Sequence, residues 1–83
     1  MCRNITILRG LEPPATAEEI EAASRQFVRK ISGIRQPSAA VEDRFERAVA
    51  EIAAISAELL GELPPRKQPP TSVPPMRRHA GHP

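Results

Sequence analysis

Cys2 is the residue of this chain with the strongest nucleophilic chemistry, and it is the single cysteine. Arg3 beside it would favour the thiolate, which is the reactive form of the side chain. A catalytic cysteine also needs a base, and none lies near Cys2 in the sequence. We therefore interpret Cys2 as a possible reactive thiol, with a reduced thiol of no particular role as the simpler alternative. A chain with one cysteine forms no internal disulfide.

The other polar residues do not form a recognisable catalytic or metal-binding set. His79 and His82 lie close together near the C-terminus, but a metal site needs three or four fixed ligands. Adjacent carboxylates such as Glu18 and Glu19 point in different directions on a helix and make a poor acid–base pair. We expect no catalytic residue, no metal site, no cofactor and no enzymatic activity. A small thiol- or metal-dependent protein that uses Cys2 is the alternative.

Basic residues give the clearest surface signal, because a cluster of them could bind nucleic-acid phosphate or an acidic protein. The candidate patch combines the end of a predicted helix and its loop with N-terminal residues that could fold back: Arg3, Arg9, Arg25, Arg29, Lys30 and Arg35. Two Phe without Trp or Tyr argue against base stacking. In a helix-turn-helix arrangement the second helix would be the recognition helix, and that helix is acidic. A nucleic-acid accessory protein is therefore an alternative and not the favoured function.

The stretch from residue 16 to residue 63 predicts two helices that pair as a hairpin. Thr16 and Glu19 form a capping box at the start of the first helix, which is expected over residues 17–32. Gly33 can take the left-handed conformation that ends a helix. The apolar face of the first helix repeats every three or four residues: Ile20, Ala23, Ser24, Phe27, Val28 and Ile31.

The second helix is expected over residues 39–62, with Ser38 as its N-cap and prolines beyond its end. Its apolar face comprises Val41, Phe45, Ala48, Val49, Ile52, Ile55, Ser56, Leu59 and Leu60. We expect Phe27 and Phe45 to anchor the core between the two helices. The predicted fold class is all-α, an antiparallel helical hairpin.

Two flanking segments complete the predicted organisation. Residues 1–15 are an N-terminal arm that ends in a stiff Pro-Pro connector. Residues 64–83 are a basic, Pro-rich C-terminal tail, which we expect to be disordered, without helix or sheet, and dispensable for folding. No apolar run reaches the roughly 18 residues of a membrane span, and the start lacks a signal-peptide core. These features predict a cytoplasmic protein that does not bind membranes.

Several stretches between residues 1 and 63 carry a recognisable pattern. They are Met1-Cys2-Arg3-Asn4-Ile5, Leu11-Glu12-Pro13-Pro14-Ala15-Thr16, Gln26-Phe27-Val28-Arg29-Lys30-Ile31-Ser32-Gly33 and Arg47-Ala48-Val49-Ala50-Glu51-Ile52. Together they resemble a family of short bacterial proteins, a domain of unknown function numbered twenty-two seventy-seven. The resemblance implies no activity, cofactor or partner, so it transfers no functional residue. The tail departs from the charged, alanine-rich ending of the family.

The unequal lengths of the two helices predict an uncovered apolar end on the second helix. At 1.5 Å per residue, about two of its turns extend beyond the first helix. This end carries a possible interface of Ile55, Leu59 and Leu60. Either two hairpins pack as a four-helix bundle, or the arm folds back and covers the end through Ile5, Leu8 and Leu11. Because two helices alone give a small core, we favour an interaction module that forms a homodimer or binds a protein partner.

Overall fold

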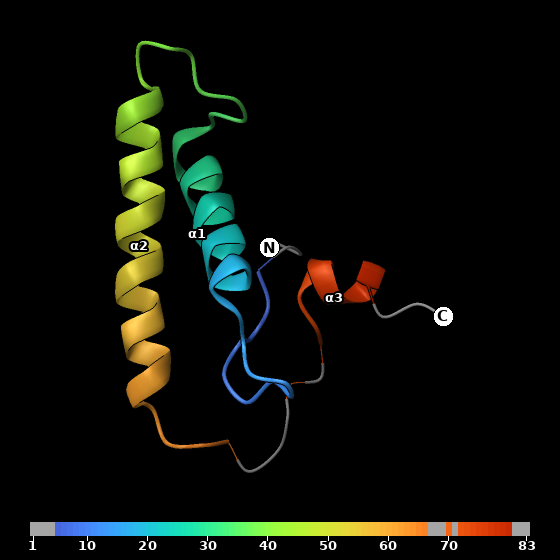
Figure 1. Cartoon of the computed structure of the whole chain (residues 1–83). Coiled ribbons are helices and arrows are strands. Elements are labelled where there is room, and N and C mark those ends of the chain that lie inside the picture. Colours follow the sequence, from blue (N-terminus) through green and yellow to red (C-terminus); the bar gives the residue numbers. More distant parts are fainter. Residues whose placement is uncertain (1–4, 67–69, 71, 81–83) are drawn as a thin grey trace.

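The computed structural model describes residues 5–66, 70 and 72–80, with side chains described as far as residue 77. Within these ranges the regular structure is entirely helical: α1 (Ala17–Ser32), α2 (Glu42–Glu62) and α3 (Pro75–Ala80). Figure 1 shows α1 and α2 side by side and antiparallel, with α3 on the side of α1 away from α2. The predicted all-α helical hairpin is confirmed. None of the helices in the described part of the chain is both long and apolar enough to cross a membrane.

The two ends of α1 follow from its own sequence. The hydroxyl of Thr16 accepts a hydrogen bond from the Glu19 N–H at 3.1 Å, and the Glu19 carboxylate accepts one from the Thr16 N–H at 2.9 Å. This is the predicted capping box. At the other end, Gly33 has a φ of 71° and donates its N–H to the Arg29 carbonyl oxygen. Because this left-handed conformation is costly for other residues, glycine ends the helix here.

The start of α2 differs from the prediction. Ser38 does not cap the helix, because the chain first forms a turn in which the Val41 N–H donates to the Ser38 carbonyl oxygen at 3.1 Å. The helix then begins at Glu42, and Val41 occupies the N-cap position without a side-chain hydrogen bond. At the other end, the Leu63 N–H donates to the Leu59 carbonyl oxygen, and Pro64 follows.

The core lies between α1 and α2 and is centred on Val28, Phe45 and Val49. On α1 the buried positions Ile20, Ser24 and Val28 are four residues apart and share one side of the helix. Phe45 is 5% exposed, which confirms it as a core residue, whereas the expectation for Phe27 is wrong. Phe27 precedes Val28 by one residue, about 100° around the helix, and its side chain is 45% exposed.

The N-terminal arm folds back against the end of the hairpin that is remote from the α1–α2 loop. Leu11 is buried and Leu8 is half-buried, and both line a groove with Ile20 and Leu60. The guanidinium of Arg9 donates to the Pro64 carbonyl oxygen from Nε at 2.9 Å and from Nη2 at 2.7 Å. These contacts correspond in part to the alternative in which the arm covers the end of the second helix: Leu60 is half-buried, but Ile55 and Leu59 stay exposed.

The described part of the tail contains more structure than its composition predicts. Pro75–Ala80 form α3, although we expected no helix after Pro64. Proline suits the first position of a helix, because its fixed φ is helical and its missing N–H has no intrahelical partner there. Pro74 is buried, and its carbonyl oxygen accepts from the Arg77 N–H at 2.9 Å. This segment of the tail therefore packs on the rest of the molecule.

Candidate functional site

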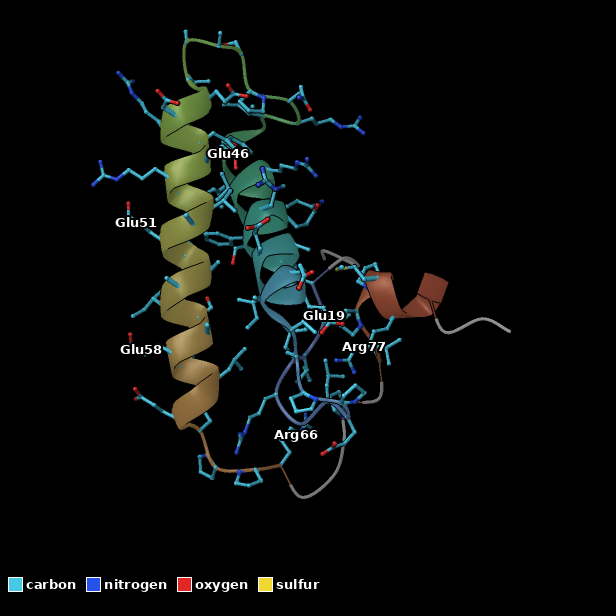
Figure 2. All side chains as sticks on the ribbon, in the orientation of Figure 1. Glu19, Glu46, Glu51, Glu58, Arg66 and Arg77 are labelled. Carbon is cyan, nitrogen blue, oxygen red and sulfur yellow. The ribbon has the colours of Figure 1, made fainter. Side chains whose placement is uncertain are left out.

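Arg77 joins the tail to the start of α1 through a largely buried ion pair. Its Nε donates to Glu19 Oε2 at 2.6 Å, and its Nη2 donates to Glu19 Oε1 at 3.0 Å. The same Nη2 donates to the carbonyl oxygens of Pro13 and Pro14. The Glu19 side chain is 4% exposed and the Arg77 side chain 18%, and Figure 2 shows the two side by side. One guanidinium thus holds together the tail, the connector and the first turn of α1.

This pairing keeps the Glu19 carboxylate charged. The hydrogen bonds from Arg77 lower the pKa of Glu19 below its ordinary value of 4.5, although burial acts in the opposite direction. The same contact raises the pKa of Arg77. Both carboxylate oxygens of Glu19 accept hydrogen bonds, Oε1 from the Thr16 N–H and Arg77 Nη2, and Oε2 from Arg77 Nε. The role of Glu19 is to fix the arm end of the hairpin.

Arg25, expected in the basic patch, bridges the two long helices instead. Its Nη1 and Nη2 donate to the two carboxylate oxygens of Glu46 at 2.6 and 2.8 Å. Its guanidinium lies 6.0 Å from the ring centre of Phe45, and Glu21 lies 3.9 Å away. The pKa of Glu46 is lowered by these hydrogen bonds from Arg25. The prediction is corrected here, because two carboxylates already neutralise this cation.

Arg9 is also separated from the expected patch, because its bond to Pro64 holds it at the arm end. Arg3 and Cys2 lie outside the described residues, so the possible reactive thiol stays a prediction. In the part of the chain that the structure describes, no group of three or more His, Cys, Asp or Glu side chains could hold a metal ion.

The structure does bring three of the predicted basic residues together, where α1 passes into the loop. They share one concave surface, the basic concavity, which is lined by Gln26, Arg29, Lys30, Gly33, Arg35 and Gln36. Lys30 and Arg35 are exposed. The Nε of Arg29 is buried and has no hydrogen-bond partner among the described residues. The lining therefore contains three cations, two amides and no carboxylate.

Apolar side chains along one side of the hairpin are exposed or, in the case of Ile52, half-buried. Phe27 and Ile52 line one groove with Ile5 of the arm. Ile55 and Leu59 extend this side along α2, because residues three and four apart lie on one helix face. The exposed fractions are 45% for Phe27, 60% for Ile55 and 57% for Leu59. We call Phe27, Ile52, Ile55 and Leu59 the apolar face.

Leu60 does not share the exposure of its neighbours in the predicted interface. It is half-buried and lines the groove in which Leu8 and Leu11 of the arm lie. One residue is about 100° of helix rotation, so the arm can cover Leu60 without reaching Leu59. The structure thus divides the predicted interface: Leu60 belongs to the arm contact, and Ile55 and Leu59 stay accessible.

The ion pair between Glu19 and Arg77 was missed by sequence reasoning. Glu19 was recognised as a capping-box residue and as one of two adjacent carboxylates, and Arg77 lies 58 positions later in a Pro-rich segment. No helical period connects positions so far apart. The available signal was charge, because residues 64–83 carry basic residues and no acid, so any ion pair of the tail must reach an acid elsewhere.

Comparison with known proteins places the chain in a family. No curated protein and no solved structure matches it. A family model matches residues 1–82, which confirms the resemblance seen in the opening and Phe-Val-Arg-Lys-Ile-Ser-Gly stretches. The chain is a small helical protein that belongs to the family described as "Uncharacterized conserved protein (DUF2277)".

Proposed function

We propose that this protein is a non-enzymatic interaction module that self-associates as a homodimer through the apolar face. The observation that carries the proposal is the exposure of Ile55 and Leu59, which stay more than half exposed although the arm folds back beside them. Exposed apolar residues that gather on one face are typical of an interface. A second hairpin supplies an apolar face of the same shape and size.

The small core of the single chain supports this proposal. In the described part of the chain, the buried hydrophobic core consists of Leu11, Ile20, Val28, Phe45 and Val49. A domain this small buries a modest fraction of its surface, and packing two hairpins as a four-helix bundle would enlarge the shared core. Two-fold packing would place the same residues on both sides of the interface. Figure 2 shows Glu51 and Glu58 pointing away from α1, on the outer side of α2, as expected for a polar rim.

Sedimentation equilibrium over micromolar concentrations tests the proposal. We expect the full chain to sediment as a dimer and Leu59→Glu to sediment as a monomer. Since Leu59 is 57% exposed in the single chain, the variant should keep its helical circular dichroism. The matched control is Ala50→Glu, because Ala50 is exposed and lies nine residues away, about half a turn around the same helix.

Ala50→Glu should still sediment as a dimer. This result would show that Leu59→Glu acts by disrupting the apolar face and not merely by adding a negative charge. A monomeric wild-type chain throughout the concentration range would contradict self-association. Equal dissociation of Leu59→Glu and Ala50→Glu would show that charge, and not the apolar face, decides the mass.

A further inference from the structure

We propose that the basic concavity at the loop end of α1 binds the phosphate groups of a small phosphorylated ligand. This site is separate from the apolar face and does not depend on dimer formation. The proposal assigns the donors to Arg29, Lys30 and Arg35, with the amides of Gln26 and Gln36 beside them.

Four of the described cations outside the concavity already have partners, whereas Arg44 and Arg66 form no ion pair with a described residue. Arg9 donates to a carbonyl oxygen, and Arg25, Arg47 and Arg77 each pair with a carboxylate. By contrast, the Arg29 Nε is buried and has no acceptor among the described residues. A buried donor without an acceptor is costly, and a small movement of the Arg29 side chain toward an anion in the concavity would relieve this cost.

The surroundings of Arg29 leave its charge available to an anion. No carboxylate lines the basic concavity. Glu46 is close enough for the charge of Arg29 to contribute to its lowered pKa. However, both oxygens of Glu46 already accept hydrogen bonds from Arg25. The Gly33 N–H is also occupied, by the Arg29 carbonyl oxygen, so this amide is not available to the anion.

The chemistry of these donors favours phosphate over a carboxylate. A guanidinium binds phosphate through a planar pair of N–H donors, and a lysine adds a further charge. Three cations around a concave surface match the multiple charges of a di- or triphosphate better than the single charge of a carboxylate. The cluster is compact, and the adjoining helix α2 begins with Glu42 and Asp43. These acids would repel a long nucleic-acid backbone that extended past the concavity, so a small ligand is favoured.

Nuclear magnetic resonance titration of the full-length chain with pyrophosphate tests the proposal. We expect saturable shifts of the backbone amides of residues 26–36 and of the Arg29 Nε–H. Arg29→Gln and Arg35→Gln should each weaken binding about tenfold or more, as for the loss of a hydrogen bond between charged groups. Arg35 is exposed, so its variant tests the site even if Arg29→Gln disturbs folding.

The matched control is Arg44→Gln, which removes the same charge from an exposed position on α2 outside the concavity. It should leave the affinity within about twofold. Equal weakening by Arg44→Gln and Arg35→Gln would overturn the proposal, because net charge would then explain the binding. Absence of saturation, or equal binding of chloride, would overturn it as well. Tighter binding of single-stranded DNA or RNA than of pyrophosphate would show that the concavity binds nucleic acid, and it would overturn the proposal of a small ligand.

Discussion

The two ends of the helical hairpin are closed in different ways. At the loop end, Arg25 and Glu46 are 21 positions apart and belong to the two helices that the loop connects. At the arm end, Arg9 reaches Pro64 across 55 positions and Arg77 reaches Glu19 across 58. Figure 1 shows the arm and the tail meeting near the start of α1, far from the loop. The loop end thus joins two helices that follow each other in the sequence, and the arm end joins segments more than fifty positions apart.

This difference predicts that the two ends have different stabilities. Contacts between distant positions close long loops, and the entropy of closure must be regained from the contacts themselves. At the loop end, Phe45 and Val49 pack against Val28 in the core. At the arm end, Leu11 and Ile20 are buried as well, but the contacts of Arg9 and Arg77 are polar and join positions more than fifty residues apart. We therefore expect the arm end to open first in the native state.

The largest expected loss of stability comes from a substitution in the core at the loop end. Phe45→Ala should destabilise the fold by about 3–5 kcal/mol, because it leaves a cavity beside Val28 and Val49. Phe27→Ala is the matched control and should cost about 1 kcal/mol, since Phe27 is already 45% exposed. Urea unfolding followed by circular dichroism measures both. The variants are best compared in the Leu59→Glu background, so that dimer formation does not contribute. Equal losses of unfolding free energy in the two variants would contradict the finding that Phe45 lies in the core and Phe27 outside it.

The second prediction concerns removal of the tail contacts at the arm end. Truncation after Leu63 removes Arg77 and Pro74, and it should lower the thermal midpoint by about 5 °C or more. Composition alone predicted almost no change. Hydrogen exchange should accelerate at residues 17–20, while the amides of residues 45–49 should keep their protection.

Arg77→Gln should reproduce most of this loss in the intact chain, because it removes the charge that pairs with Glu19. Met76→Ala is the control in the same short helix, since Met76 is 46% exposed. An unchanged midpoint after truncation would show that the tail contacts contribute nothing to stability.

The third prediction compares how the ion pairs at the two ends make stability depend on pH. The pKa values of Glu19 and Glu46 are both lowered in the folded state, by Arg77 and Arg25 respectively. The stabilisation is therefore complete above the ordinary glutamate pKa of 4.5, and it is lost as pH falls below 4.5 toward the folded values. The thermal midpoint should fall on acidification through this range.

Glu19→Gln should flatten this pH dependence more than Glu46→Gln does. The Glu19 side chain is 4% exposed, whereas that of Glu46 is 47% exposed and solvent screens its ion pair. Glutamine also fits the capping box, so the variant removes the charge and keeps the local structure. The same pH profile in Glu19→Gln and in wild type would show that Glu19 does not contribute to acid sensitivity.

The smallest expected effects compare two glycines with positive φ, Gly33 at the loop end and Gly10 at the arm end. Gly33→Ala should cost about 1 kcal/mol, because a left-handed backbone is strained for alanine and the space around it is open. A Cβ on Gly10 would also meet the Arg66 side chain at 2.9 Å, so Gly10→Ala should cost slightly more. In the chain truncated after Leu63 this excess should disappear. If Gly10→Ala still costs more than Gly33→Ala in the truncated chain, the contact with Arg66 does not explain the difference.

Local signals in the sequence predicted both ends of α1 and one residue of the core. The capping box of Thr16 and Glu19, the left-handed Gly33 and the buried Phe45 all depend on neighbours within one helix or one turn. The start of α2 was placed too early, because a turn and a helix at Ser38 begin with similar dihedral angles and hydrogen bonds. Phe27 was assigned to the core because a stripe of apolar residues is wider than the side that a single partner helix can cover.

The sequence by itself determined the two long helices, their antiparallel pairing and a stretch of basic residues at the end of α1. Apolar periodicity and capping act within a few residues, so these features need no knowledge of the rest of the chain. Only the tertiary structure decided which cations remain available and which apolar residues are covered. It paired Arg25 with Glu46 and Arg77 with Glu19, and it covered Leu60 while Leu59 stayed exposed. These contacts depend on which distant segments of the chain pack together, and neither residue spacing nor composition specifies that packing.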